Sequence, residues 1–136
     1  MVRKEEWGST LLRVILGIVF LVHGYTKFQG GIGYTVDFFE SLGLPGFSAY
    51  IVAGIELVGG IALVLGLGTR IVAGLLAIIL AVATIKVKLA VGFLGNGQMA
   101  GYELDLALFA MAIYLALKSK TFLALDHVIF RKKSVE

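Results

Sequence analysis

Residues 48–89 read SAYIVAGIELVGGIALVLGLGTRIVAGLLAIILAVATIKVKL. Two long apolar runs, 48–67 and 70–89, flank a short turn with glycine at positions 66 and 68. A helix rises about 1.5 Å per residue, so about 20 such residues cross the ~30 Å hydrocarbon core of a bilayer. The stretch therefore predicts two membrane-spanning helices joined by a tight turn.

Two further runs have the same character, 8–27 before this stretch and 102–117 after it. Between the first two runs, residues 34–42 predict a short amphipathic helix on the membrane surface. The Asn96–Gly97 pair favours a turn in the loop 92–101, and residues 121–130 predict an interfacial tail. Together these segments predict an all-α, integral membrane four-helix bundle that forms a single domain over residues 1–136.

The composition agrees with a membrane protein. Hydrophobic residues make up 59% of the chain, whereas soluble domains average about 45–50%. The chain has no cysteine, which excludes disulfides and thiol chemistry by its own side chains. No small-x-small cleavage site follows the first run, so we expect a span there and not a cleaved signal peptide.

The basic residues predict the orientation of the spans. Cytoplasmic loops carry an excess of lysine and arginine, and most of the basic residues fall on one side of a four-span arrangement. That side holds Arg3, Lys4, Arg70, Lys118, Lys120, Arg131, Lys132 and Lys133, whereas the other holds Lys27, Lys86 and Lys88. We therefore expect a bacterial plasma-membrane protein with both termini in the cytoplasm. We expect its basic residues to contact lipid headgroups and not to bind nucleic acid.

Several charges lie where a simple membrane anchor would have none. A charge near the bilayer centre costs about 2.5–3.5 kcal/mol, so it is expected to be paired, turned inward or functional. One helical stripe of the first span holds Arg13, Gly17, Phe20, Gly24 and Lys27, with His23 at its edge. The two glycines of this stripe favour close approach of a neighbouring helix.

The two spans that return across the membrane each carry an inward acid in this interpretation. Glu56 has Gly59 and Gly60 one turn away, so we expect it to face another helix. In the fourth span, the face that we expect to point inward carries Glu103, Ala107, Ala110 and Tyr114.

The third span carries two lysines, Lys86 and Lys88, that lie about 200° apart around a helix and cannot both point inward. Small and polar residues at positions 70, 74, 77, 81 and 84 lead to Lys88, whereas bulky apolar residues line the Lys86 side. We therefore expect Lys88 to face the bundle and Lys86 to reach the outer interface.

Most of these groups share one depth, in the outer half of the membrane: His23, Lys27, Glu56, Lys88 and Glu103. The set is close to neutral, so it predicts either ion pairs that fasten the helices or a polar pocket that binds a small ligand or relays protons. We favour the pocket, because buried ion pairs add little net stability. Proton exchange is assigned to His23, Glu56 and Glu103, and ligand binding to Arg13, Lys27, Lys88 and Tyr114.

Two cofactor alternatives have less support. His23, Glu56 and Glu103 are suitable ligand types for a metal but have no diagnostic spacing, so no metal is assigned. His23 alone cannot supply the paired axial ligands of a b-type haem, and His127 falls in the tail. The cofactor stays open, with a quinone as the candidate.

The two halves of the chain echo each other. Arg13-Val-Ile-Leu-Gly17 is similar to Arg70-Ile-Val-Ala-Gly74, and Gly54-Ile-Glu56-Leu57 to Gly101-Tyr-Glu103-Leu104. The echo predicts two helical hairpins related by a parallel repeat about the membrane normal. Glu56 and Glu103 would then be counterparts that face one cavity.

The same residues carry a family resemblance. The segments are Arg13-x-x-x-Gly17, His23-Gly24-x-x-Lys27, Gly43-Leu-Pro45, Gly54-Ile-Glu-Leu-Val-Gly59, Gly66-Leu-Gly-Thr-Arg70 and Gly101-Tyr-Glu103. In this order and spacing they resemble the DoxX family of small bacterial four-helix membrane proteins, most closely the Gram-positive members described as oxidoreductases of the catechol-response type. The resemblance implies a plasma-membrane protein linked to redox metabolism, in some relatives a subunit that works with quinone or sulfur substrates.

Three functions are open at this point. The first is a redox-associated protein that binds a quinone or similar small molecule and receives electrons from a partner protein or a bound cofactor. The second is a small transporter or exporter of a phenolic or organic anion, with Glu56 as a proton-coupled switch. The third is a structural subunit of a membrane complex whose ion pairs only hold helices together. An oligomer is compatible with each of them.

Overall fold

The structure is a computed structural model that describes residues 4–118. Its elements, in order, are α1 (Lys4–Gln29), α2 (Gly33–Ser41), α3 (Phe47–Leu65), α4 (Thr69–Ala83), the π-helix η1 (Thr84–Lys88), α5 (Leu89–Val91) and α6 (Tyr102–Leu117). Residues 4–118 contain no strand, so the prediction of an all-α chain is confirmed. The tail expected at 121–130 lies outside the described residues.

Within residues 4–118, three helical stretches are long and apolar enough to cross a membrane: Lys4–Gln29, Phe47–Leu65 and Thr69–Val91. They correspond to the first three predicted spans, and the third combines α4, η1 and α5. The fourth predicted run forms a helix with the predicted bounds, but α6 has only 16 residues. The short helix predicted at 34–42 is also present, as α2.

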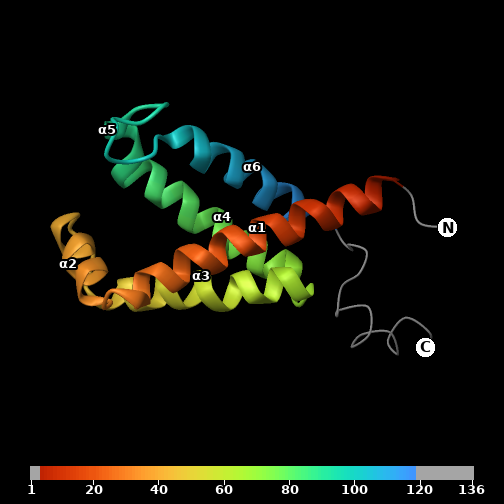
Figure 1. The fold of residues 1–136 in the computed structure, drawn as a ribbon, viewed down its shortest axis with the longest axis horizontal. Coiled ribbons are helices and arrows are strands. Elements are labelled where there is room, and N and C mark those ends of the chain that lie inside the picture. The colour runs from red at the N-terminus through yellow and green to blue at the C-terminus, as the bar shows by residue number, and fades with distance from the viewer. Residues whose placement is uncertain (1–3, 119–136) are drawn as a thin grey trace.

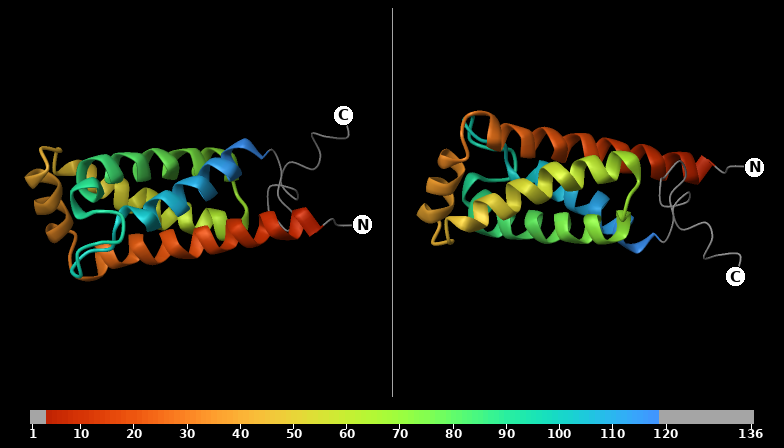
Figure 2. Two further views of the ribbon diagram at one scale, coloured as in Figure 1. Left: turned by 90° about the horizontal axis from the view of Figure 1, so that it is seen from above. Right: turned by 90° about the horizontal axis from the view of Figure 1, so that it is seen from below.

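The helices α1, α3, α4 and α6 run side by side along the long axis of the molecule (Figure 2). At one end, here called the α2 end, α2 and the loop 92–101 cover the helix ends. The opposite end, here called the Lys4 end, holds the start of α1, the turn between α3 and α4, and the end of α6. In Figure 1 α1 lies along α3 and α4 lies along α6, and the two pairs diverge toward the α2 end.

The contact between α1 and α3 is the most extensive in the molecule, and glycines make it possible. A Cβ atom added at Gly17 would lie 2.8 Å from the carbonyl oxygen of Gly60. A Cβ at Gly24 would lie 2.5 Å from the backbone nitrogen of Leu57, and one at Gly60 would overlap the backbone of Leu21. The close approach predicted for the glycine stripe of the first span is therefore confirmed.

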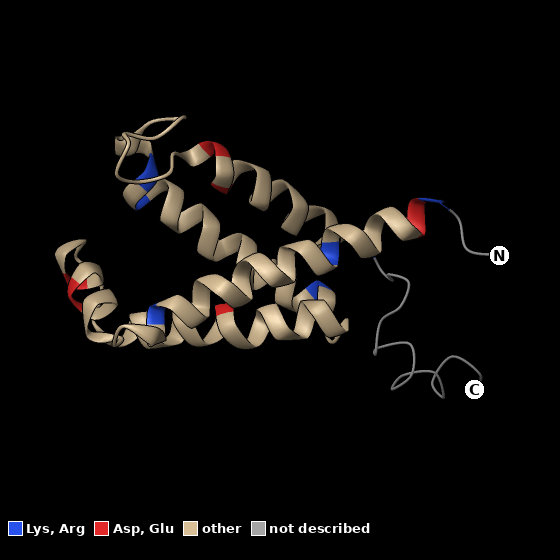
Figure 3. Ribbon diagram, viewed as in Figure 1, with Lys and Arg blue, Asp and Glu red and all other residues tan. Residues whose placement is uncertain are grey.

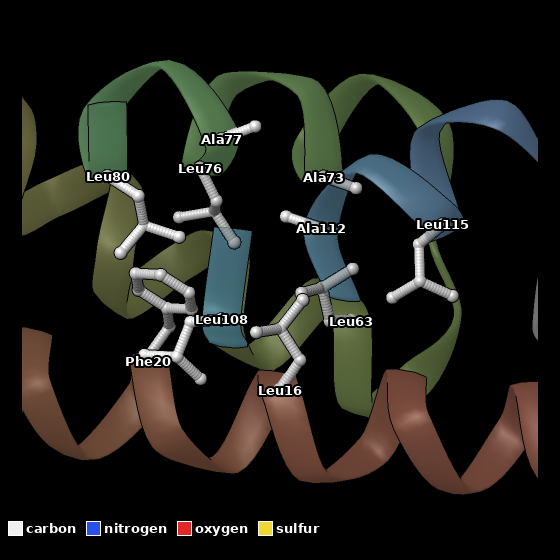
Figure 4. Close-up of a cluster of buried hydrophobic side chains, with 10 residues drawn as sticks. All are labelled: Leu16, Phe20, Leu63, Ala73, Leu76, Ala77, Leu80, Leu108, Ala112 and Leu115. Atoms are coloured by element: carbon white, nitrogen blue, oxygen red, sulfur yellow. The ribbon is translucent and has the colours of Figure 1, made fainter. Parts of the chain in front are cut away.

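The second pair, α4 and α6, has a different kind of contact. Small residues come from α4, Ala73 and Ala77, whereas α6 supplies Leu108 and Leu115 (Figure 4). The α1 and α3 side chains Leu16, Phe20 and Leu63 meet this pair and complete the core, together with Leu76, Leu80 and Ala112. Both α4 and α6 thus supply large and small side chains to this core.

This packing corrects the inward face expected for the fourth span. The residues expected to point inward, Glu103, Ala107, Ala110 and Tyr114, are all exposed in the structure. Its buried face consists of Asp105, Leu108, Ala112 and Leu115. Ala107 and Ala110 are exposed, and the alanine of α6 that packs in the core is Ala112.

The predicted turns are present. Gly66 and Gly68 adopt positive φ angles of 78° and 56° in the turn between α3 and α4, a backbone conformation that favours glycine. In the loop 92–101 the side-chain oxygen of Asn96 accepts hydrogen bonds from the backbone N–H groups of Gln98 and Met99, at 3.0 and 2.9 Å.

One element was not predicted. Between α4 and α5 the helix widens into the π-helix η1, where the N–H of Leu89 bonds to the carbonyl of Thr84. A π-turn holds one residue more than an α-turn and occurs often at functional sites. Here it carries both lysines of the third span.

Candidate functional site

The strongest polar contact inside the bundle joins α1 to α3. Lys27 Nζ donates to Glu56 Oε1 at 2.5 Å, and this is the ion pair that the structure gives within residues 4–118. The Glu56 side chain is only 5% exposed, and that of Lys27 is 26% exposed. Gly24 lies against the backbone of Glu56 and Leu57, so the absence of a side chain at Gly24 lets α3 come close enough for Lys27 to reach the acid.

His23 lies one turn before Lys27, at the edge of the same stripe. Its ring Nδ1 is 2.7 Å from the carbonyl oxygen of Val19. A carbonyl oxygen only accepts, so Nδ1 carries the hydrogen and the neutral ring has its lone pair on Nε2. The His23 side chain is exposed, so this nitrogen is available to exchange protons.

A second polar group lies on the facing pair of helices. Asp105 of α6 is 6% exposed, and its Oδ2 is 3.5 Å from Thr84 Oγ1 of η1. Lys88, also in η1, donates to the carbonyl oxygen of Ala100 at 2.9 Å. Asp105, Thr84 and Lys88 thus form a second polar group, on α6 and η1, toward the same α2 end as the Lys27–Glu56 pair (Figure 1).

Of the two lysines of the third span, Lys88 is the more buried, in the order expected for them. Lys88 is half-buried and bonded to the loop, whereas Lys86 is exposed. The π-turn changes the rotation between neighbouring residues, so the angle of about 200° between Lys86 and Lys88 in an ideal α-helix does not apply here. The two lysines nevertheless differ in burial as expected.

Glu103 differs from its prediction. It is exposed, whereas its proposed counterpart Glu56 is buried, so the two glutamates are not equivalent in the structure. The buried acid of this helix is Asp105, which the sequence interpretation missed. Its signal was the apolar spacing Leu108, Ala112 and Leu115, which continues the same face at steps of three and four residues.

Arg13 and Tyr114 do not join the cluster at the α2 end. Arg13 is fully buried, but the 14 positions between it and Lys27 correspond to about 21 Å along a helix. Tyr114 lies near the Lys4 end, where its hydroxyl is 2.6 Å from Ser9 Oγ. Ser9 Oγ donates to the carbonyl of Glu5, so Tyr114 is the donor in the contact between them.

The remaining surroundings are apolar. Figure 3 shows few charges on the described helices and long stretches without any. An apolar groove between α3 and α4, lined by residues such as Ile51, Val58 and Leu75, lies on a different side of α3 from the Lys27 contact. Within residues 4–118 no three histidine, aspartate or glutamate side chains come together as a metal site would need.

Comparison with known proteins gives consistent matches. The DoxX family model matches residues 8–89. "Putative oxidoreductase CatD" of Bacillus subtilis (strain 168) is 50% identical over 133 residues, which cover 98% of this chain and 95% of that protein. "Inner membrane protein YqjF" of Escherichia coli (strain K12) is 34% identical over 70 residues, which are 52% of this chain and 53% of that protein. A Haemophilus influenzae protein described as uncharacterized is 32% identical over 136 residues, 96% of each chain. No solved structure matches significantly.

Proposed function

Because this chain belongs to the DoxX family of membrane proteins, we propose that it is a redox-associated protein that binds a quinone or similar small molecule at the α2 end. The proposal rests mainly on one observation: a buried glutamate ion-paired to a lysine, beside a histidine with an available nitrogen, in a mostly apolar bundle that buries few other charges. The name of the Bacillus relative, "Putative oxidoreductase CatD", supports a link to redox chemistry.

The chemistry of a quinone suits these residues. Its ring is apolar and matches the bundle, whereas its carbonyl oxygens accept hydrogen bonds and gain negative charge on reduction. The ammonium groups of Lys27 and Lys88 would stabilise that charge. Reduction to a quinol takes two electrons, which a partner redox protein would supply, and two protons, which His23 and Glu56 would take up from water and pass to the quinone oxygens.

The proposal includes a topology. In it α6 is the fourth crossing, both termini are cytoplasmic, and the α2 end lies at the outer face of a bacterial plasma membrane. A helix of 16 residues spans about 24 Å, slightly less than the hydrocarbon core, and a bilayer accommodates such a difference by local thinning. The exposed aromatic side chains of α2, Tyr34 and Phe38, suit the interface at that end.

The binding test uses menadione, a compact naphthoquinone, with the full-length protein in detergent micelles. We expect saturable binding by equilibrium dialysis, weakened about tenfold or more by Glu56→Gln or His23→Gln. The exposed Glu103→Gln is the matched control and should bind like the wild type. Wild-type protein that binds no menadione above empty micelles would reject the proposal. Efflux of a phenolic anion from sealed liposomes by the same protein would then favour the transporter.

A further inference from the structure

An apolar groove separates α3 from α4, on a different side of α3 from the Lys27–Glu56 pair. The two helices are joined by a tight turn, but they contact each other less than α1 contacts α3 or α4 contacts α6. In Figure 1, α4 diverges from α3 toward the α2 end. The lining agrees with this divergence: α4 contributes Val72 and Leu75, near the turn, whereas α3 lines the groove from Ala62 to Tyr50. The groove is therefore a wedge that opens toward the α2 end.

The groove faces the hydrocarbon of the bilayer in a chain that spans a membrane. Its apolar side chains Ile51, Val58 and Leu75 are exposed. At Gly54 the wall is bare, because a Cβ atom added there would meet nothing within 4 Å. An empty space beside these residues would lose the dispersion contacts that a filled one provides. Hydrocarbon is therefore expected to fill the groove.

The size of the groove decides which kind of hydrocarbon fits. Its volume is about 390 Å³. The stretch of α3 from Tyr50 to Ala62 is about 18 Å long, so dividing the volume by this length gives a mean cross-section of about 22 Å². A helix with its side chains is about 10–12 Å across and needs about 80 Å² or more. A helix of a second copy or of another protein is therefore too wide, whereas a single extended acyl chain fits.

A basic side chain lies at the open end of the groove, on the same face of the third span. Apolar residues at steps of three and four lead from the groove toward the α2 end: Val72, Leu75, Ile79 and Val82. The next position at this spacing is Lys86, which is exposed. Lys86 and the exposed Tyr50 each lie within about 8 Å of the α2 end of their own spans. A lysine and a tyrosine at this level suit lipid headgroups.

We propose that this groove binds an anionic phospholipid of the leaflet at the α2 end, with one acyl chain between α3 and α4 and the phosphate beside Lys86. The acyl chain fills the space that opens where α4 diverges from α3 (Figure 1). The ammonium group of Lys86 attracts the negative headgroup. Because the Lys27–Glu56 pair lies on another side of α3, this site is separate from the proposed quinone site, and neither proposal depends on the other.

Native mass spectrometry tests this with full-length protein that has been washed free of lipid in detergent and then titrated with dioleoylphosphatidylglycerol. We expect one bound lipid per chain, and about fivefold weaker binding of dioleoylphosphatidylcholine, which has the same acyl chains but no net charge. Gly54→Leu fills the groove from its bare wall and should weaken phosphatidylglycerol binding about tenfold. Gly74→Leu is the matched control and should bind like the wild type, because a Cβ atom added there also meets nothing within 4 Å and Gly74 does not line the groove.

Lys86→Gln tests the headgroup contact and should bind both lipids equally, whereas Lys4→Gln, an exposed lysine at the opposite end of the molecule, should keep the preference for phosphatidylglycerol. Wild-type protein without a bound lipid, unchanged binding in Gly54→Leu, or a preference that survives Lys86→Gln would overturn the proposal. If Gly54→Leu fails to fold, the Lys86→Gln result decides. A wild-type dimer that Gly54→Leu separates would assign the groove to a second copy of the chain and would also overturn it.

Discussion

Lys27 and Glu56 show at the level of single residues why a charge can persist inside this bundle. The charge of each side chain is stabilised by the opposite charge of the other, 2.5 Å away. Removing either side chain leaves the other charge without a partner in apolar surroundings. Removing one partner of a buried pair typically costs about 3–5 kcal/mol, whereas replacing both by apolar groups is often neutral. Lys27 is partly exposed, so the lower end of that range applies.

We expect Lys27→Met to lower the free energy of unfolding by about 3 kcal/mol, measured by titration of the detergent-solubilised protein with a denaturing detergent. Lys86→Met, which removes an exposed lysine of η1, is the control and should change stability little. The double variant Lys27→Met/Glu56→Leu should recover most of the loss. Equal stability of Lys27→Met and wild type would mean that the pair does not hold α1 to α3.

The residue-level predictions succeeded where one helix face was marked by several signals together. In α1, glycines and charges share a stripe, and Arg13, Gly17, Phe20 and Gly24 are all buried. In α6 the local echo of Gly-x-Glu-Leu pointed to Glu103, but the burial of a helix face depends on its neighbour. The signal for that face within α6 was the spacing of Leu108, Ala112 and Leu115, which continues from Asp105 and not from Glu103.

Among the helices, α1 and α3 depend on glycine more than any other pair. We expect Gly60→Ala to weaken their contact, because its Cβ would meet the backbone of Leu21, which cannot move away as a side chain could. Gly74→Ala, whose Cβ meets nothing within 4 Å, is the matched control and should gain about 0.5–1 kcal/mol through its better helix propensity. Thermal denaturation in detergent measures both, and a Gly60→Ala variant as stable as Gly74→Ala would contradict this account of the contact.

The π-helix makes a separate prediction about the third span. Since a π-turn contains one extra residue, deleting Ile85 should convert it to an α-turn and keep the helix on either side in register. The α-helical turns around Ile78 contain no extra residue. Deleting Ile78 should therefore rotate all side chains after it about the helix axis, relative to the helices that they pack against. Both isoleucines are exposed, 68% and 63%, so loss of packing at the deleted residue is similar. We expect folded yield by size-exclusion chromatography to fall far more for the Ile78 deletion; the reverse order would show that the π-turn is required for folding.

The extra residue also explains why this element was not predicted. Apolar periodicity locates a helix by its average repeat, and one inserted residue within 69–91 changes that average little. The bounds of α3, by contrast, follow from glycine-containing turns on either side, and the start of α6 follows from the glycine-containing loop before it, so the sequence located them within a few residues.

At the scale of the whole molecule, the open question is which ends share a side of the membrane. The chain has no native cysteine, so single-cysteine variants report position directly. We expect a membrane-impermeant maleimide added to intact cells to label Gln98→Cys but neither Lys4→Cys nor Lys118→Cys. Labelling of both Gln98→Cys and Lys118→Cys from outside would mean that α6 does not cross the membrane.

The central claim is that a quinone-like ligand binds at the α2 end between the Lys27–Glu56 pair and Asp105. The most direct measurement is photolabelling of the purified protein with an azido derivative of menadione, followed by mapping of the modified residues by mass spectrometry. We expect labels on α1 near His23 and on η1 near Thr84, and we expect excess menadione to prevent this labelling. Labels confined to the apolar groove of Ile51, Val58 and Leu75, or spread along the exposed helix faces without competition, would contradict it.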